Sequence, residues 1–204
     1  ADPLEPEGNG YWYADCESAR IGDEYRFHLV NGQSEFSRID PYAREVTNSV
    51  GNAVVQDTDF DWGDEAAEPF TLPPLNELVI YELHIGTFQD DDGAQGDFKS
   101  ATTRLGHLKR LGINCIEIMP IAEFPGDVSW GYNPSQVFAV ATAYGGPKAL
   151  KKFIKTCHSW GIGVLLDVVY NHFGPSDLDL WQFDGWSENG MGGIYFYQDQ
   201  RSHT

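Results

Sequence analysis

Three apolar stretches separated by two amphipathic segments limit most strongly what this chain can fold into. Residues 78–85, 113–119 and 163–170 are near-continuous apolar runs with the length of strands. Between them, residues 97–111 and 147–160 place apolar side chains at helical spacing. Strands that are apolar on both faces and alternate with helices are typical of a parallel sheet covered by helices. The sequence therefore predicts an α/β protein.

Two α/β architectures agree with this pattern, an open doubly wound sheet and a (β/α)8 TIM barrel. No Gly-x-Gly-x-x-Gly motif follows the first strand, which disfavours a dinucleotide-binding sheet. The segments at 86–96, at 120–145 and after residue 171 are long and polar, and barrels carry their active sites on such loops. A whole barrel needs about 250 residues. We therefore expect residues 78–204 to be the N-terminal part of a barrel, with its first three strands, and the chain to be a fragment.

The residues before position 78 differ in composition from those after it. Residues 1–63 are rich in turn formers and aromatics, and short strands are predicted at 10–16, 24–32 and 52–57. This pattern indicates part of a small β-sandwich. Residues 64–77 are acidic and rich in proline, so they are expected to link the two regions.

The net charge indicates which classes of partner to expect, and the cysteines indicate the redox state of the compartment. The net charge is −18, from 31 acidic and 13 basic residues. Such a chain repels phosphate backbones and anionic lipid, so neither nucleic acid nor a membrane is an expected partner. The cysteines Cys16, Cys115 and Cys157 lack metal-ligand spacing, and no cofactor is expected. Reduced thiols, with Cys115 and Cys157 buried, favour a cytoplasmic protein.

Polar side chains gather where the third strand stops. Asp167 interrupts the apolar run, and Asn171 and His172 follow it. By itself Asp167 is usually a structural carboxylate with a buried partner, and His172 a loop histidine. In a parallel barrel, however, the carboxyl ends of the strands converge on one pocket, where a carboxylate and an imidazole can bind hydroxyl groups.

These residues carry a family resemblance. The segment DVVYNH (167–172) resembles a conserved region of glycoside hydrolase family 13, the α-amylase family. IYELHIGTF (80–88) resembles the first barrel strand of that family, and the segment at 116–139 its second strand and following loop. The match covers about residues 78–185 in order. More loosely, residues 1–63 are similar to the early-set, carbohydrate-binding-like sandwich that precedes the barrel in the branching-enzyme and trehalohydrolase groups of the family.

The resemblance implies roles for residues of the two loops. Tyr132 would stack on the glucose at the cleavage point, and Trp130 belongs to the same substrate-binding motif. Asp167 and His172 would hold hydroxyls of that glucose. Asn171 matches a position that binds calcium in many members but only supports the loop in the branching-enzyme group, so no metal is expected.

The resemblance also implies which residues are missing. The catalytic nucleophile and acid/base of this retaining family come from later strands, so no catalytic residue is expected among these 204 and the chain alone should not catalyse a reaction. For the parent enzyme we expect action on α-1,4-glucans such as glycogen, starch or maltooligosaccharides, by branching through transfer to a 6-hydroxyl. The alternatives are hydrolysis, as in a trehalohydrolase or an amylase, a non-catalytic glucan-binding or interaction homologue, and an unrelated barrel. The aromatic segment LWQFDGW (180–186) is a candidate either for contact with a glucan chain or for packing at the barrel rim.

Overall fold

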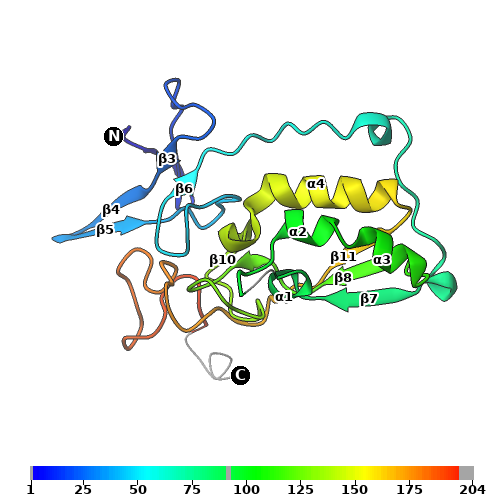
Figure 1. Ribbon diagram of the computed structural model, residues 1–204. Coiled ribbons are helices and arrows are strands. Elements are labelled where there is room, and N and C mark those ends of the chain that lie inside the picture. The colour runs from blue at the N-terminus through cyan, green and yellow to red at the C-terminus, as the bar shows by residue number, and fades with distance from the viewer. Residues whose placement is uncertain (1, 91–92, 198–204) are drawn as a thin grey trace.

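The computed structural model describes residues 2–90 and 93–197, and its central element is a parallel sheet (Figure 1). Strands β7 (Ile80–Leu83), β8 (Cys115–Ile118) and β11 (Gly163–Leu166) pair in the order β11-β8-β7. Ile80 and Gly163 both pair with Cys115, so the three strands begin in register. The predicted α/β sheet is confirmed, and the described part of it is open at both edges.

The strands are shorter than the apolar runs that predicted them. The third run was expected to continue to residue 170, but β11 ends at Leu166, so Asp167 lies just beyond the strand and not within it. The Asp167 amide still donates to the Ile118 carbonyl at 2.9 Å. The chain therefore leaves the sheet with the Asp167 backbone held by β8, which fixes the direction of its side chain.

Helices cover one face of this sheet (Figure 1). The single helix expected at 97–111 is divided into α2 (Phe98–Thr102) and α3 (Leu105–Arg110). The hydroxyls of Thr102 and Thr103 donate to the carbonyls of Phe98 and Ser100, and this bonding back to the preceding turn accompanies the break. The helix α4 (Gly146–Ser159) was predicted, and Pro147 lies in its first turn.

The main core lies between these helices and the sheet. Tyr144, Phe98, Phe124 and Phe153 are its largest fully buried rings, and the rings of Phe98 and Phe153 are 5.8 Å apart between centroids. The predicted burial of Cys115 and Cys157 is confirmed. The short helix α1 (Ile85–Phe88) directly follows the strand β7, and the short helix η3 (Thr142–Tyr144) directly precedes α4.

The loop after β8 contains an antiparallel pair that the sequence analysis did not predict. Strand β9 (Ala122–Glu123) pairs with β10 (Gln136–Val140). The Glu123 carboxylate is buried and accepts from the Thr142 amide at 2.7 Å. Burial raises the pKa of this carboxyl, although the bond from Thr142 opposes the shift. The hairpin thus closes the long loop at its base and leaves residues 124–135 as the tip.

The N-terminal region forms three separate two-stranded antiparallel sheets. They pair β1 (Glu5–Gly8) with β2 (Tyr11–Tyr13), β3 (Glu24–Tyr25) with β6 (Ala53–Val54), and β4 (Phe27–Asn31) with β5 (Ser34–Arg38). The predicted strands are therefore present in part, whereas their assembly into a sandwich stays a prediction. A small core of Ile39, Ala43, Val46 and Ala53 includes Ala139 of β10, so this region packs on the α/β unit.

The expected linker packs against the C-terminal end of α4 and then reaches the start of β7 (Figure 1). It contains the short helices η1 (Gly63–Ala66) and η2 (Leu75–Glu77). Glu65 lies 2.9 Å from the Nδ1 atom of His158, and the Phe70 ring stacks on that imidazole at 4.3 Å between centroids. Segment 64–77 is therefore an ordered strap across the helix. Among the described residues, every helix is too short or too polar to be a candidate membrane span.

Candidate functional site

The candidate site lies where two neighbouring strands deliver their loops. Asp167 follows β11 directly, and Tyr132 lies at the tip of the loop that leaves β8. Because β8 and β11 are parallel and adjacent, both loops start at the same end of the sheet. Gly174 lies in the loop after β11 and Pro134 in the loop after β8. The Gly174 amide donates to the Pro134 carbonyl at 2.7 Å, and this bond joins the two loops.

Three of the predicted residues form one hydrogen-bonded cluster, Tyr132, Asp167 and His172. The Tyr132 hydroxyl donates to Asp167 Oδ2 at 2.7 Å, and His172 Nε2 lies 2.6 Å from the Tyr132 carbonyl oxygen. Tyr132 is 39% exposed, so part of its ring is open to solvent. The bond to Asp167, together with smaller contributions from desolvation and nearby carboxylates, raises the pKa of Tyr132 to about 12. The phenol therefore stays a donor at neutral pH.

Asn171 contacts the other nitrogen of the imidazole whose tautomer the Tyr132 carbonyl sets. Its amide nitrogen lies 2.6 Å from His172 Nδ1. Because the Tyr132 carbonyl can only accept, the hydrogen of neutral His172 belongs on Nε2, and Nδ1 accepts from Asn171. Asn171 thus joins the cluster through His172, and its role stays a prediction.

Trp130 is the one predicted residue that the structure leaves outside this network. It is 74% exposed, and its indole has no hydrogen bond or ring contact recorded in the described part of the chain. It lies two positions from Tyr132 on the same loop tip, so the two side chains share a segment without sharing a partner. Its role in substrate binding stays a prediction.

A second layer behind the loop was not predicted from the sequence. His84, at the end of β7, places Nε2 2.7 Å from the Ser129 carbonyl oxygen, and the Tyr144 hydroxyl donates to the same oxygen at 3.1 Å. The Ser129 hydroxyl in turn accepts from the Gly131 amide at 2.9 Å. Burial raises the pKa of Tyr144 to about 12, which keeps its hydroxyl protonated. A polar residue at the end of the first apolar strand was the available signal for His84.

Gly131 lets the loop tip lie against the end of β8. Its φ is +88°, and a Cβ atom there would lie 2.0 Å from the Pro120 carbonyl oxygen. Only glycine fits both the conformation and the space. The position of Tyr132 therefore depends on the absence of a side chain next to it.

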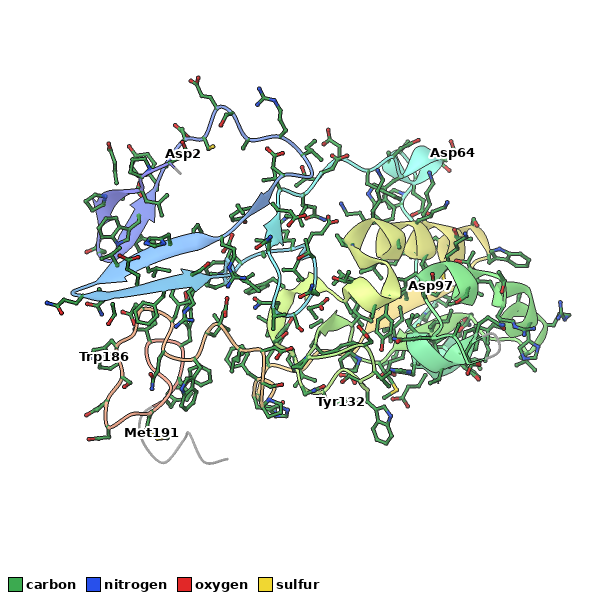
Figure 2. The ribbon with its side chains drawn as sticks, turned by 60° about the vertical axis from the view of Figure 1, so that its left-hand side comes forward. Asp2, Asp64, Asp97, Tyr132, Trp186 and Met191 are labelled. Carbon is green, nitrogen blue, oxygen red and sulfur yellow. The ribbon has the colours of Figure 1, made fainter. Side chains whose placement is uncertain are left out.

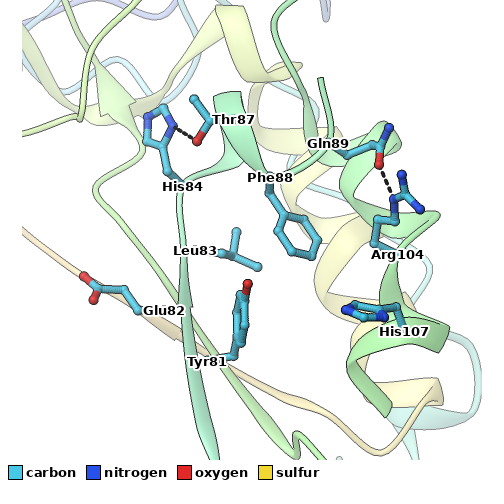
Figure 3. A pocket seen from close by; sticks show the side chains of 9 residues that line it. All are labelled: Tyr81, Glu82, Leu83, His84, Thr87, Phe88, Gln89, Arg104 and His107. Atoms are coloured by element: carbon cyan, nitrogen blue, oxygen red, sulfur yellow. Dashed lines mark hydrogen bonds between the residues drawn. The ribbon is translucent and has the colours of Figure 1, made fainter. Parts of the chain in front are cut away.

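A cavity of about 470 Å³ lies beside β7 (Figure 3). It shares His84 with the second layer. Arg104 and Gln89 are hydrogen-bonded at its rim. Its lining consists of Tyr81, Glu82, Leu83, His84, Thr87, Phe88, Gln89, Arg104 and His107. Tyr132, Asp167 and His172 are not among these residues, so the cavity and the cluster are distinct.

The chemistry of the cluster suits a neutral, hydroxyl-rich ligand. Asp167 Oδ2 is occupied by Tyr132, while Oδ1 can accept a further hydroxyl. The exposed part of the Tyr132 ring offers an apolar face beside these polar groups. Among residues 2–90 and 93–197, no group of three or more His, Cys, Asp or Glu side chains is arranged to hold a metal ion.

A parallel α/β unit with a polar cluster on its β→α loops defines a class, the proteins that bind small polar molecules at the carboxyl ends of parallel strands. The family model of the α-amylase catalytic domain matches residues 79–185. The chain belongs to the α-amylase family, glycoside hydrolase family 13.

Its relatives include enzymes with two different activities. The chain is 40% identical to a malto-oligosyltrehalose trehalohydrolase from Saccharolobus solfataricus, over 84% of this chain and 29% of the relative. It is 34% identical to a 1,4-alpha-glucan branching enzyme from Salinibacter ruber, over 91% of this chain and 32% of the relative. The chain thus spans about three tenths of the length of these relatives.

Solved structures agree with the family assignment. A putative alpha amylase from Salmonella typhimurium superimposes with a TM-score of 0.78 at 33% identity, over 87% of this chain and 29% of the other. A pullulanase from Bacillus acidopullulyticus superimposes with a TM-score of 0.76 at 23% identity, over 97% of this chain and 28% of the other, which shows the shared fold.

Proposed function

We propose that this chain forms the part of an α-glucan-active enzyme that holds one glucose unit next to the bond to be cleaved. The observation that carries the proposal is the Tyr132–Asp167–His172 cluster at the carboxyl ends of β8 and β11. In this proposal the Tyr132 ring stacks on the apolar face of the glucose, and Asp167 Oδ1 accepts one of its hydroxyls.

The support residues would act before the sugar arrives. His172 directs Nε2–H to the Tyr132 carbonyl, so it would fix the backbone that carries the ring. A direct bond from His172 to a sugar hydroxyl requires that this contact be exchanged. A site whose groups already hold each other loses little freedom when ligand binds, which favours affinity.

For the parent enzyme we propose retaining cleavage of an α-1,4 bond followed by transfer to a 6-hydroxyl. The branching enzymes among the relatives support this choice, and the 40% identity to a trehalohydrolase supports hydrolysis as the second candidate. A retaining mechanism needs a nucleophile and an acid/base about 5 Å apart. We propose that both come from outside these residues, so that this chain binds glucan without turning it over. A cytoplasmic location, and partners that exclude nucleic acid and membranes, stay predictions.

Calorimetric titration of the chain with maltotriose tests the binding role. We expect measurable binding that Asp167→Asn weakens about tenfold, because one charge-assisted hydrogen bond is lost. Asp127→Asn is the matched control, since this exposed carboxylate lies on the same loop as Tyr132 and makes no hydrogen bond within residues 2–90 and 93–197. Absence of binding by the unmodified chain would refute the proposal.

The reaction is tested on the full-length parent incubated with amylose. New α-1,6 linkages in the product indicate transfer. Reducing ends or free trehalose without new linkages indicate hydrolysis instead. Release of neither by a correctly folded parent would point to a non-catalytic homologue.

A further inference from the structure

The loop that leaves the candidate site is attached to the N-terminal hairpin. Arg26, just before β4, donates from Nη2 to Asp179 Oδ2 at 2.7 Å. The same carboxylate oxygen accepts from the Ile39 amide at 2.7 Å. The two charged side chains are only 23% and 24% exposed, so solvent screens the pair less than a surface ion pair. Asp179 follows His172 by seven positions in the same loop.

A second arginine holds the next part of the loop by its backbone. Arg38 of β5 donates from Nε to the Phe183 carbonyl at 2.9 Å and from Nη2 to the Gln182 carbonyl at 3.0 Å. Asn31, at the end of β4, donates to the Asp184 carbonyl at 2.9 Å. Three successive carbonyls of one loop are thus bound by side chains of one hairpin.

Close packing completes the attachment. Gly185 has a φ of +80°, and a Cβ atom there would lie 2.4 Å from the Phe36 ring of β5. On the other side, the Gln182 amide donates to the Gly192 carbonyl at 2.8 Å. The backbone at 182–185 is therefore held from both sides.

Two indoles flank this held backbone and stay open to solvent. Trp181 is 44% exposed and Trp186 is 48% exposed. The Trp181 ring meets Phe196 edge to face at 5.3 Å between centroids, which leaves one ring face uncommitted by that contact. Figure 2 shows Trp186 on the loop that lies beneath the β4–β5 hairpin. Half-exposed indoles on a fixed backbone can stack on a flat apolar ligand at a low entropic cost.

We propose that Trp181 and Trp186 form an additional contact surface for the α-glucan chain, beyond the glucose held at Tyr132. This inference rests on the proposed function. Glucose units are uncharged and present an apolar C–H face to aromatic rings, whereas an anionic polymer would be repelled by a chain of net charge −18. The loop that carries both indoles starts at His172, which belongs to the cluster. Arg26 and Arg38 are then positioning residues for glucan binding.

The length of the ligand separates this surface from the candidate site. In calorimetric titrations, replacing both Trp181 and Trp186 by alanine is expected to weaken maltoheptaose binding about five- to tenfold and to leave maltotriose binding unchanged. Trp160→Ala is the matched control, because this indole is 45% exposed at the far end of α4. Unchanged maltoheptaose affinity, or equal weakening for both sugars, would overturn the inference.

A measurement on the unmodified chain removes the dependence on a variant that folds poorly. Maltoheptaose should shift the indole N–H resonances of Trp181 and Trp186 in the nuclear magnetic resonance spectrum, and the resonance of Trp160 should stay in place. Maltotriose should leave all three unshifted. If maltotriose binds but maltoheptaose shifts neither loop indole, this inference fails and the proposed function stands. If neither sugar binds, both fail.

The positioning role has its own test. Arg38→Ala keeps both indoles but frees the backbone at 182–183, so maltoheptaose affinity should fall about threefold and hydrogen exchange of residues 180–186 should rise. Arg38→Lys, which can restore one of the two bonds, should recover part of the affinity. Arg44→Ala is the control, since this arginine is exposed in the same region. Faster exchange without any loss of affinity would overturn the positioning role.

Discussion

At the residue scale, the hydrogen bond between Tyr132 and Asp167 should be detectable in the pH at which the phenol of Tyr132 ionises. The bond raises the pKa of Tyr132 from 10.0 to about 12. The folded state therefore holds the proton more tightly than the unfolded state does. Its stabilising contribution is complete below pH 10 and is lost as the pH rises from 10 towards 12.

The pH dependence of the Tyr132 signal tests this hydrogen bond. In a titration of ring-labelled tyrosine followed by nuclear magnetic resonance, the Tyr132 signal should have its midpoint near pH 12. Asp167→Asn should move the midpoint back towards 10, because the charged acceptor is gone. Tyr132→Phe identifies the signal by its disappearance. A midpoint that Asp167→Asn leaves unchanged would contradict the assigned bond.

A second residue-scale prediction concerns Gly131. Gly131→Ala places a methyl group against the Pro120 carbonyl oxygen at a φ of +88°, so the loop must shift. The free energy of unfolding should fall by about 2–3 kcal/mol in urea titrations. Gly126→Ala is the control, because its φ is +76° but a Cβ atom there meets nothing within 4 Å. It should cost about 1 kcal/mol. Equal losses in the two variants would show that the close approach at Pro120 has no energetic effect.

At the element scale, the capping box of α2 can be isolated from the packing of the helix. Asp97 accepts from the Ser100 amide, and the Ser100 hydroxyl accepts from the Asp97 amide. Asp97→Ala should lower the free energy of unfolding by about 1 kcal/mol, measured by urea titration. Asp97→Ser retains a capping oxygen and should lose much less. An alanine variant as stable as the parent would mean that α2 is held by its buried face alone.

Regular elements of this chain were largely predictable, and their ends were not. The apolar runs located β7, β8 and β11, because the strands of a parallel sheet covered by helices read as near-continuous apolar runs. The predicted end of the third strand at residue 170 was wrong, because apolar residues continue in the sequence after β11 ends at Leu166. The hairpin of β9 and β10 was missed because its pairing is irregular and shows no clean alternation.

The site was predictable only in its most recognisable part. Asp167 and His172 could be predicted as binding residues because they are polar and lie at a strand end. The role of Tyr132 was implied only by the family resemblance. His84, Ser129 and Tyr144 were missed, since contacts between residues 15 and 45 positions apart leave no local pattern. Two of those contacts end on a backbone carbonyl, which no sequence motif records.

At the scale of the whole molecule, the strap at 64–77 ties the N-terminal region to the outer side of α4. Phe70→Ala removes the ring that stacks on His158. The free energy of unfolding should fall by about 1–2 kcal/mol. Limited proteolysis should then cut the strap faster than it cuts α4. Leu75→Ala is the control, because this leucine is 83% exposed, and it should change neither quantity. Equal cutting rates in both variants would show that the strap is held by other contacts.

The attachment of Arg26 to Asp179 also has a consequence for the order in which the protein is made. The two residues are 153 positions apart in the sequence. A ribosome adds about 5–20 residues each second. The hairpin therefore emerges roughly eight to thirty seconds before the loop that it binds. During that interval Arg26 can bond only to nearby partners such as Ser37, and Arg38 can lie over the Phe36 ring, but the bonds of both arginines to the loop form only when the loop arrives.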